Sequence, residues 1–281
     1  MPVTAGAMVR AVMIMFVAMS LIPAGDSAGK ILTSQLGVAP VFVAWSRFAI
    51  GALLLVPFAP PQTRALFGNW RIWVRAAILC GSITCIQTAL VTEDVANVFA
   101  AFFIGPLLSY VLAALFLREA ISLQRSALIV AGFLGVLVVV RPGLEPSAGL
   151  LWALTAGTLY GVFLTMSRWL SHLAPPLALT FSQLVISGLL LLPLGLVYFP
   201  PLTGPVLGLS LASALCSMLG NLLMLYAYRM APATKVAPLV YLQLLSAVGL
   251  GWLVFGAWPD ALTWAGMAMI LGAGIASARL R

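Results

Sequence analysis

The chain has very few charged residues, and this scarcity decides its class. Charged side chains make up 7% of its 281 residues, whereas apolar types make up 63%. A soluble globular protein carries about 25% charged residues, which cover the surface that faces water. A water-facing surface of that kind cannot be built from this composition, so the surrounding solvent is expected to be lipid.

Acidic residues are scarcer still, with six against fourteen Lys and Arg, and the net charge is +8. A basic chain first suggests a nucleic-acid partner. The Lys and Arg residues, however, stand singly between apolar runs and form no patch interleaved with aromatic residues. Positive charge placed in this way sets membrane topology. We therefore expect a lipid bilayer and no nucleic acid as the environment of the chain.

Groups that could carry catalysis or hold a metal are nearly missing. His172 is the only histidine and stands at a short break between two apolar runs, while Cys80, Cys85 and Cys216 lie inside such runs. An intramembrane enzyme needs a catalytic set such as paired carboxylates or a Ser/His pair, and a channel needs a ring of like charges or a filter motif. We expect neither, and we expect no catalytic residue, metal or cofactor. No nucleotide-binding loop is present, so transport would be driven by gradients or exchange.

Long apolar runs are abundant instead, and a helix needs about 20 such residues to cross the hydrocarbon core. Breaks at charges, Pro and Gly clusters predict ten spans joined by short connections. The first is interpreted as a retained span rather than a cleaved signal. The ten predicted spans are 11–33, 39–59, 72–91, 96–117, 124–140, 150–170, 176–199, 206–228, 234–255 and 262–278.

The basic residues fall on alternate sides of these spans very unequally. One side collects eleven of the fourteen, and the other has only Arg141 clearly at a span end. Because loops rich in Lys and Arg stay in the cytoplasm, a multi-pass protein with both termini cytoplasmic is predicted.

The chain also matches itself at an offset of 136 to 137 residues. Pro40 falls on Pro176 and Ser46 on Ser182, and Leu107-Leu108-Ser109 falls on Leu244-Leu245-Ser246. The match predicts two repeats, residues 1–142 and 146–281, of five spans each. Because five is odd, the second repeat would enter the membrane from the opposite face. The predicted fold is therefore all-α: a polytopic membrane protein with ten transmembrane helices as two inverted five-helix repeats, an architecture typical of secondary transporters.

Two stretches at equivalent places resemble a known family. They are the run from Phe103 through Pro106 to Leu117-Arg118-Glu119, and the run from Tyr226 to Pro238 that continues through Tyr241, Gln243 and Gly251–Gly256. Both are similar to EamA-type members of the drug/metabolite transporter superfamily, and the resemblance covers essentially the whole chain. A Gly-Glu pair is common at the end of the fourth and ninth spans of that family. Here the first copy is Arg118-Glu119, and the second, Phe255-Gly256-Ala257, lacks the acidic residue.

The resemblance implies secondary transport of a small-molecule substrate across a bacterial inner membrane. Export of amino acids, whether neutral, hydrophobic or aromatic, is the leading hypothesis. Import of a vitamin or nucleotide-like metabolite is the alternative. Coupling to protons stays open, as does the choice between a monomer and a homodimer.

The first two predicted spans contain three charged residues, and a charge inside a span costs about 2.5–3.5 kcal/mol on insertion scales. Asp26 and Lys30 share one helix face four residues apart, and Arg47 lies in the next span. A rise of 1.5 Å per residue places Asp26 and Arg47 both roughly 10–12 Å below the outer surface. Depth therefore permits an ion pair between them, with Lys30 above it extending outward. This group is predicted to form an outer gate, a carboxylate anchor or a proton-coupling site. A neutralised pair that only fixes two helices is the alternative.

Further polar and aromatic residues in mid-span complete the predicted substrate-binding or gating set. For the amides, hydrogen bonds between helices are the alternative to substrate contact, and for the aromatics, core packing is. Pro23, Pro106 and Pro238 are candidate bend points. Glycines of the fifth and tenth spans indicate close helix packing away from the pore. The additional candidate residues are Gln87, Phe103, Tyr160, Asn221, Tyr241 and Gln243.

Overall fold

The described part of the chain is helical throughout. A computed structural model describes residues 5–116, 123–140, 147–230 and 242–279, and no strand occurs among them. The helices are α1 (Ala5–Ser34), α2 (Pro40–Leu55), η1 (Val56–Phe58), α3 (Thr63–Leu66), α4 (Trp70–Thr92), α5 (Val95–Phe102), α6 (Ile104–Phe116), α7 (Leu123–Val140), α8 (Ala148–Trp169), α9 (Pro176–Val197), α10 (Gly204–Met230), α12 (Leu242–Phe255) and α13 (Ala261–Arg279).

Seven stretches in the described residues are long and apolar enough to cross a membrane. They coincide with the first four predicted spans and with the sixth, seventh and eighth. The other three predicted spans contain apolar helices that are shorter than a full crossing: Ser126–Val139, Gln243–Phe255 and Ala261–Ala273. The all-helical class of the fold is confirmed, and seven of the ten predicted spans are present at full length.

Several helices begin or end at residues that the sequence marks for this purpose. Proline opens α2 and α9 at Pro40 and Pro176, where the missing N–H has no helical partner to lose. Asn69 caps α4 by accepting a hydrogen bond from the N–H of Arg71 at 3.0 Å. Gly256 ends α12 with a φ of 67°, a left-handed conformation that glycine adopts without strain.

The fourth predicted span is interrupted, because α5 ends at Phe102 and α6 begins at Ile104. Pro106 has no N–H to donate to the carbonyl of Phe102 four residues earlier, which accounts for a break at this place. Pro23, by contrast, lies inside helix α1, which continues through it. Pro238 lies outside the described residues.

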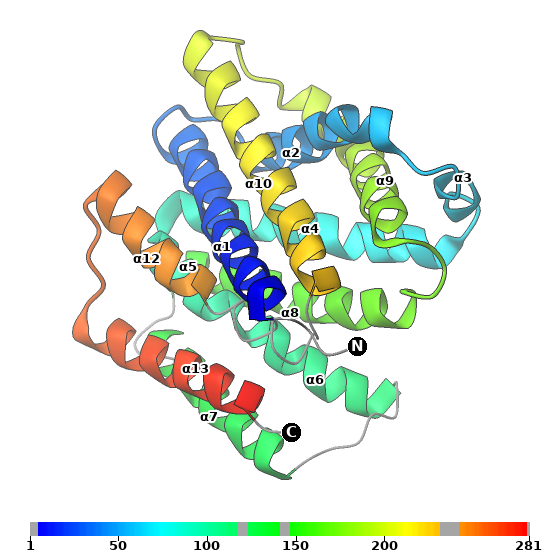
Figure 1. Ribbon diagram of the computed structural model, residues 1–281. Helices are drawn as coiled ribbons and strands as arrows, with labels where there is room; N and C mark the ends of the chain where they lie inside the picture. The colour runs from blue at the N-terminus through cyan, green and yellow to red at the C-terminus, as the bar shows by residue number, and fades with distance from the viewer. Residues whose placement is uncertain (1–4, 117–122, 141–146, 231–241, 280–281) are drawn as a thin grey trace.

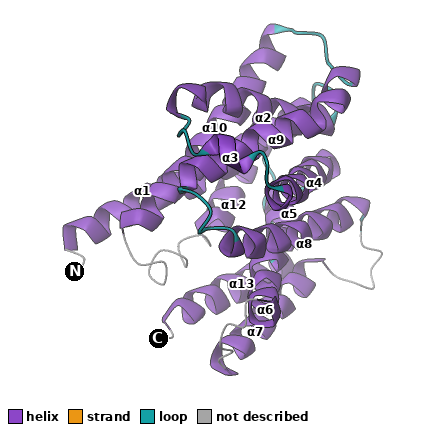
Figure 2. Cartoon of the chain, turned by 90° about the vertical axis from the view of Figure 1, so that its right-hand side faces the viewer, coloured by secondary structure: helices purple, strands orange, loops and turns teal. Residues whose placement is uncertain are grey.

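Helices far apart in the sequence pack in pairs. Helix α1 runs along α10, and α4 runs along α8; α2 packs against α9, and α7 against α13. The α2–α9 pair lies at one side of the molecule and the α7–α13 pair at the opposite side, with α1, α4, α8 and α10 between them (Figures 1 and 2). The central helices are therefore the ones that can surround a site shared by distant parts of the chain.

Glycines permit the closest of these helix contacts. A Cβ atom on Gly25 of α1 would lie 2.9 Å from the carbonyl oxygen of Ser213 on α10. A Cβ atom on Gly135 of α7 would lie 2.8 Å from the carbonyl oxygen of Gly266 on α13. Both distances are shorter than a Cβ tolerates, so the backbones approach only because these residues have no side chain. The expected close packing of the fifth and tenth spans is present in the α7–α13 pair.

The outer surface of the bundle is apolar. Phe116, Val197 and Leu253 are each more than 70% exposed. A soluble protein seldom exposes large apolar side chains in such number, whereas lipid tails solvate them well. His172, in contrast, is exposed in the turn between α8 and α9, as expected of a residue in a connection.

Candidate functional site

The predicted ion pair between Asp26 and Arg47 is present, and it lies inside the bundle. Asp26 comes from α1 and Arg47 from α2, and the side chain of each is 4% exposed. Nη1 of Arg47 donates to Oδ1 of Asp26. Two opposite charges at the same depth of adjacent helices neutralise each other, which lowers the cost of removing both from water.

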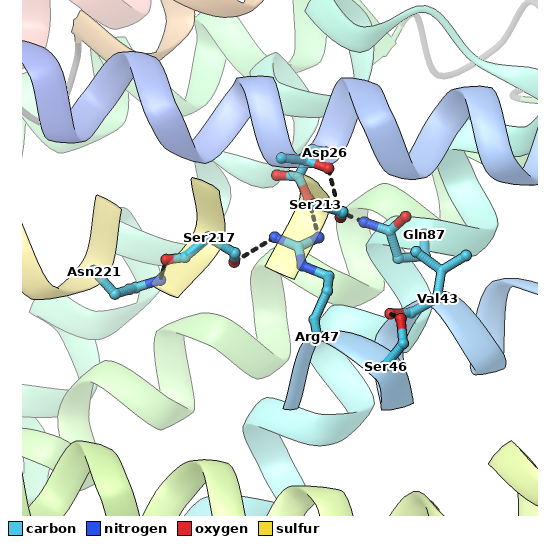
Figure 3. A network of polar contacts seen from close by, with 9 residues as sticks. Asp26, Val43, Ser46, Arg47, Gln87, Ser213, Ser217 and Asn221 are labelled. Atoms are coloured by element: carbon cyan, nitrogen blue, oxygen red, sulfur yellow. Dashed lines mark hydrogen bonds and ion pairs between the residues drawn. The ribbon is translucent and has the colours of Figure 1, made fainter. Parts of the chain in front are cut away.

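Two further helices complete this group (Figure 3). Nε2 of Gln87, on α4, donates to the same Oδ1 of Asp26 at 2.9 Å. Nη2 of Arg47 donates to Oγ of Ser217, on α10, at 2.6 Å. We call Asp26, Arg47, Gln87 and Ser217 the Asp26–Arg47 network. It joins α1, α2, α4 and α10 through hydrogen bonds to charged atoms, which are stronger than those between neutral groups.

Gln87 is completely buried, and its side chain has one polar atom to spare. Its exposure is 0%, and Oε1 has no hydrogen-bond partner in the described structure. A Cβ atom on Gly29 would collide with this oxygen, so Gly29 leaves the space that Gln87 occupies. A buried unsatisfied carbonyl oxygen costs about 1–3 kcal/mol. The network is therefore neutral in charge but retains an acceptor that a donor group of a solute could satisfy.

Helix α10 presents a stripe of polar side chains toward α1. Ser213, Ser217 and Asn221 follow one another at intervals of four residues, which places them on one face. Oγ of Ser213 donates to the carbonyl oxygen of Gly25 at 2.7 Å, and Nδ2 of Asn221 donates to the carbonyl of Ser217 at 2.7 Å. Asn221 is exposed and bonds within its own helix, so it adjoins the network rather than belonging to it. Ser217 was missed from the sequence, although the spacing of the stripe signals it.

Lys30 lies one helical turn beyond Asp26 and is not part of the ion pair. Nζ of Lys30 donates to the carbonyl oxygen of Glu93 at the end of α4, and it lies 5.3 Å from the centroid of the Phe255 ring on α12. Only 9% of the residue is exposed. Lys30 thus extends toward the Glu93 end of α4, the end predicted to face outward, where a backbone carbonyl and an aromatic ring hold its ammonium group.

Two of the three predicted aromatic residues, Phe103 and Tyr160, lie in the apolar core that α4, α5, α7, α8, α12 and α13 form. Phe103 is 3% exposed and stands at the break between α5 and α6. Tyr160 packs between Phe102 and Phe163, with ring centroids 4.8 and 5.8 Å away. Gln243 is buried at 8% exposure in α12, and Tyr241 lies outside the described residues. The structure thus brings three of the predicted residues, Asp26, Arg47 and Gln87, into direct contact.

A second buried polar group surrounds Arg75, one of the eleven basic residues on the side predicted to be cytoplasmic. Arg75 is 6% exposed in α4. Its Nε donates to Oγ of Ser167 on α8 at 2.9 Å, and its Nη1 donates to the carbonyl oxygen of Leu179 on α9 at 3.3 Å. Its guanidinium carbon lies 4.8 Å from the centroid of the Phe163 ring. Arg71, one turn earlier, is exposed, so burial separates two arginines that look alike in the sequence.

Gln183 of α9 lies next to this second group. Its Nε2 donates to the carbonyl of Ala76 at 3.3 Å and to Oγ of Ser187 at 2.8 Å, while its Oε1 has no partner in the described structure. At the repeat offset of 136, Gln183 corresponds to Arg47. In the second predicted repeat, the counterpart of Arg47 is therefore an amide. It lies next to the Arg75 group and not next to a carboxylate.

These groups can bind ions and hydrogen-bonding solutes, but they form no metal centre. Over the described ranges, no three His, Cys, Asp or Glu residues lie close enough to hold a metal ion. The two groups consist of amides, hydroxyls and guanidinium groups on helices, with the carboxylate of Asp26 in the first, and such groups are suited to reversible recognition.

Proteins that are similar in sequence to this chain include three that are named as transporters or exporters. An S-adenosylmethionine uptake transporter of Rickettsia felis is 25% identical over 88% of this chain and 86% of its own length. A riboflavin transporter of Rhizobium johnstonii is 28% identical over 87% of this chain and 82% of its own length. A pseudopaline exporter, CntI of Pseudomonas aeruginosa, is 30% identical over 85% of this chain and 86% of its own length.

A solved crystal structure shares the fold with a TM-score of 0.66 at 17% identity, covering 95% of this chain and 96% of the other. The sequence model of the EamA-like transporter family matches the chain twice, over residues 9–141 and over residues 147–277. Together the two matches leave only the ends and a short junction uncovered, so the chain belongs to the EamA-like transporter family.

Proposed function

We propose that this chain is a secondary transporter that moves a small organic solute across a bacterial inner membrane by alternating access. The observation that carries the proposal is the Asp26–Arg47 network. It is a buried set of polar contacts between α1, α2 and α4 on one side and α10 on the other. Contacts of this kind hold two parts of a carrier together in one state and separate in the other.

The proposed carrier has ten spans in two inverted halves, residues 1–142 and 146–281, with both termini in the cytoplasm. The three shorter apolar helices α7, α12 and α13 belong to the fifth, ninth and tenth spans in this arrangement. Helix pairing supports it: α1 with α10 and α4 with α8 are the two pairs that an exchange of the halves would interconvert. The pairs α2–α9 and α7–α13 would each be mapped onto themselves. The double family match, once in each half, supports the same division.

The solute we propose is an amino acid or a metabolite that carries an amino-acid end. Arg47, Arg75 and the spare amide oxygens of Gln87 and Gln183 offer donors for a carboxylate and acceptors for an ammonium group. The leading direction is export, and one relative is named an exporter. Import is the second candidate, favoured because other relatives are named for S-adenosylmethionine uptake and riboflavin transport.

A pair of cell assays tests the function and its direction. Cells that lack the protein and cells that overproduce it are compared for resistance to each amino acid and to its toxic analogues. Export predicts that overproduction raises resistance and accelerates efflux. If resistance stays unchanged while overproduction rescues a vitamin auxotroph at low external vitamin, export is wrong and import is the function.

Proton coupling is proposed for Asp26, because its carboxylate is the only acid in the network. Purified protein in proteoliposomes is given a pH gradient, and accumulation of the solute against its own gradient is measured. Asp26→Asn is expected to abolish uphill movement while leaving downhill exchange measurable. Uphill, pH-driven transport by Asp26→Asn would show that the proton binds elsewhere.

A further inference from the structure

The Arg75 group has a positive charge that no described carboxylate neutralises. Four of the six acidic residues are in the described ranges, namely Asp26, Glu93, Asp94 and Asp260. Asp26 forms its ion pair with Arg47 and not with Arg75. The recorded partners of Arg75 are a hydroxyl oxygen and a carbonyl oxygen, which are both neutral. A guanidinium group has five N–H donors, and these partners engage two of them.

The burial of Arg75 distinguishes it from an arginine that only sets membrane topology. An arginine that serves only membrane topology extends to water, as Arg71 does against the rings of Trp70 and Trp169. Arg75 instead lies inside the bundle, between α4, α8 and α9, with its guanidinium over Phe163. A buried unpaired cation is costly, and in a membrane protein such residues usually mark a substrate pathway.

We propose that Arg75 and Ser167 form an oxyanion-binding site that receives the carboxylate of the transported solute at the Trp70 end of α4, the end expected to face the cytoplasm. This inference rests on the proposed transport function and specifies its chemistry. Ser167 is only partly buried, so protein does not cover its whole surface. The free N–H donors of a planar guanidinium match the two oxygens of a carboxylate. The phosphate of an anionic lipid offers the same chemistry, so the experiment must separate the two sources.

The site is probed with a cysteine beside Arg75. Ser167→Cys is introduced after Cys80, Cys85 and Cys216 have been replaced, and the protein is reconstituted in phosphatidylcholine vesicles. Rates of modification are measured with an anionic methanethiosulfonate bearing a sulfonate and a cationic one bearing trimethylammonium, each relative to a free thiol in solution. Attraction by Arg75 is expected to favour the anionic reagent on the order of tenfold.

Matched variants assign the preference to one side chain. Arg75→Gln is expected to abolish the preference for the anionic reagent, while Arg71→Gln, one turn away and exposed, should leave it in place. A cysteine at the exposed His172 should show a ratio that does not depend on Arg75. Because Arg75→Gln could fail to fold, Arg75→Lys provides a second variant, which keeps the charge and should keep most of the preference.

Four outcomes decide the inference. A preference that requires Arg75 supports the oxyanion site. A ratio that is the same with and without Arg75, or a Ser167→Cys that neither reagent modifies from either side, overturns it. If phosphatidylglycerol added to the vesicles blocks the anionic reagent, the occupant is a lipid headgroup, and the assignment to a solute carboxylate is wrong.

Protection of the thiol by amino acids, measured in the same vesicles, tests recognition of the carboxylate independently of transport. Protection of the Ser167→Cys thiol by L-leucine or L-phenylalanine, but not by their carboxamides, supports recognition of the carboxylate. Equal protection by the carboxamides contradicts it. If the wild-type protein moves none of the amino acids, the proposed amino-acid function fails, while the dependence of the reagent ratio on Arg75 still decides whether an oxyanion site exists.

Discussion

Two arginines are buried in the described bundle, and they are held in opposite ways. Arg47 donates to Asp26 and Ser217, so its charge is neutralised by a carboxylate. Arg75 donates to Ser167 and to the carbonyl of Leu179, neither of which carries charge. The difference teaches that burial alone does not define the role of an intramembrane arginine. A paired arginine joins helices, whereas one with neutral partners retains the ability to attract an anion.

The largest effect is expected when the carboxylate of the paired arginine is removed. Asp26→Ala leaves Arg47 buried without its counter-charge and should lower the free energy of unfolding by about 3–5 kcal/mol. Chemical unfolding of the protein in detergent micelles measures this. Asp94→Ala is the control, because Asp94 is exposed. A loss for Asp26→Ala as small as that of the control would mean that Arg47 does not depend on the ion pair.

Removing both charges of the pair should restore much of the lost stability. Asp26→Leu combined with Arg47→Met leaves no unpaired charge, and apolar replacement of a buried pair is often neutral. We expect the double variant to unfold at a higher denaturant concentration than Asp26→Leu alone, although it should not transport. A double variant less stable than either single variant would show that the two residues do not act as a pair.

Arg75→Met is expected to cost less than Asp26→Ala, at about 1–2 kcal/mol. It removes two hydrogen bonds to neutral oxygens and leaves no opposite charge behind. Methionine retains much of the contact with Phe163, so packing changes little. Unfolding in the same micelles measures the difference. A cost equal to that of Asp26→Ala would indicate that Arg75 has a counter-charge in the residues that the structure does not describe.

Lys30 is an intermediate case and should show the smallest effect. Its ammonium bonds to a carbonyl oxygen and lies over a ring, contacts that contribute about 0.5–1 kcal/mol. Lys30→Met keeps the stem and removes both interactions. Hydrogen exchange at the end of α4 is expected to accelerate, because the carbonyl oxygen of Glu93 loses the donor that holds the end of the helix, while unfolding changes little. Unchanged exchange near Glu93 would contradict this contact.

The comparison also shows how far the sequence could predict the site. Asp26 and Arg47 could be paired in advance, because charges at equal depth in consecutive spans have few other partners. The partners of Ser217 and Ser167 could not be predicted, because the packing of α10 on α1 and of α8 on α4 depends on contacts between distant segments. Arg75 was missed for a similar reason: the pattern of Arg71 and Arg75 is typical of a span end, and only the packing of α8 and α9 on α4 buries one of them.

The fold was easier to predict than the site. Hydropathy alone places the apolar helices, since an unsatisfied backbone in lipid leaves few alternatives to a helix. The break at Phe103 follows from Pro106, but Pro23 behaves differently within α1, because neighbouring groups decide whether a proline interrupts a helix. The sequence predicted that Lys30 extends outward, but its acceptor, the carbonyl of Glu93 at the end of α4, depends on the packing of distant segments.

Helix α4 contributes to both polar groups, with Gln87 bound to Asp26 and Arg75 bound to Ser167. It is continuous from Trp70 to Thr92, and the two residues lie roughly 18 Å apart along its axis. A continuous helix of this length moves as a stiff rod. In the alternating-access cycle proposed above, a tilt of α4 that draws Gln87 away from Asp26 would also change the position of Arg75 unless the helix pivoted there, so α4 would couple the two ends of the carrier.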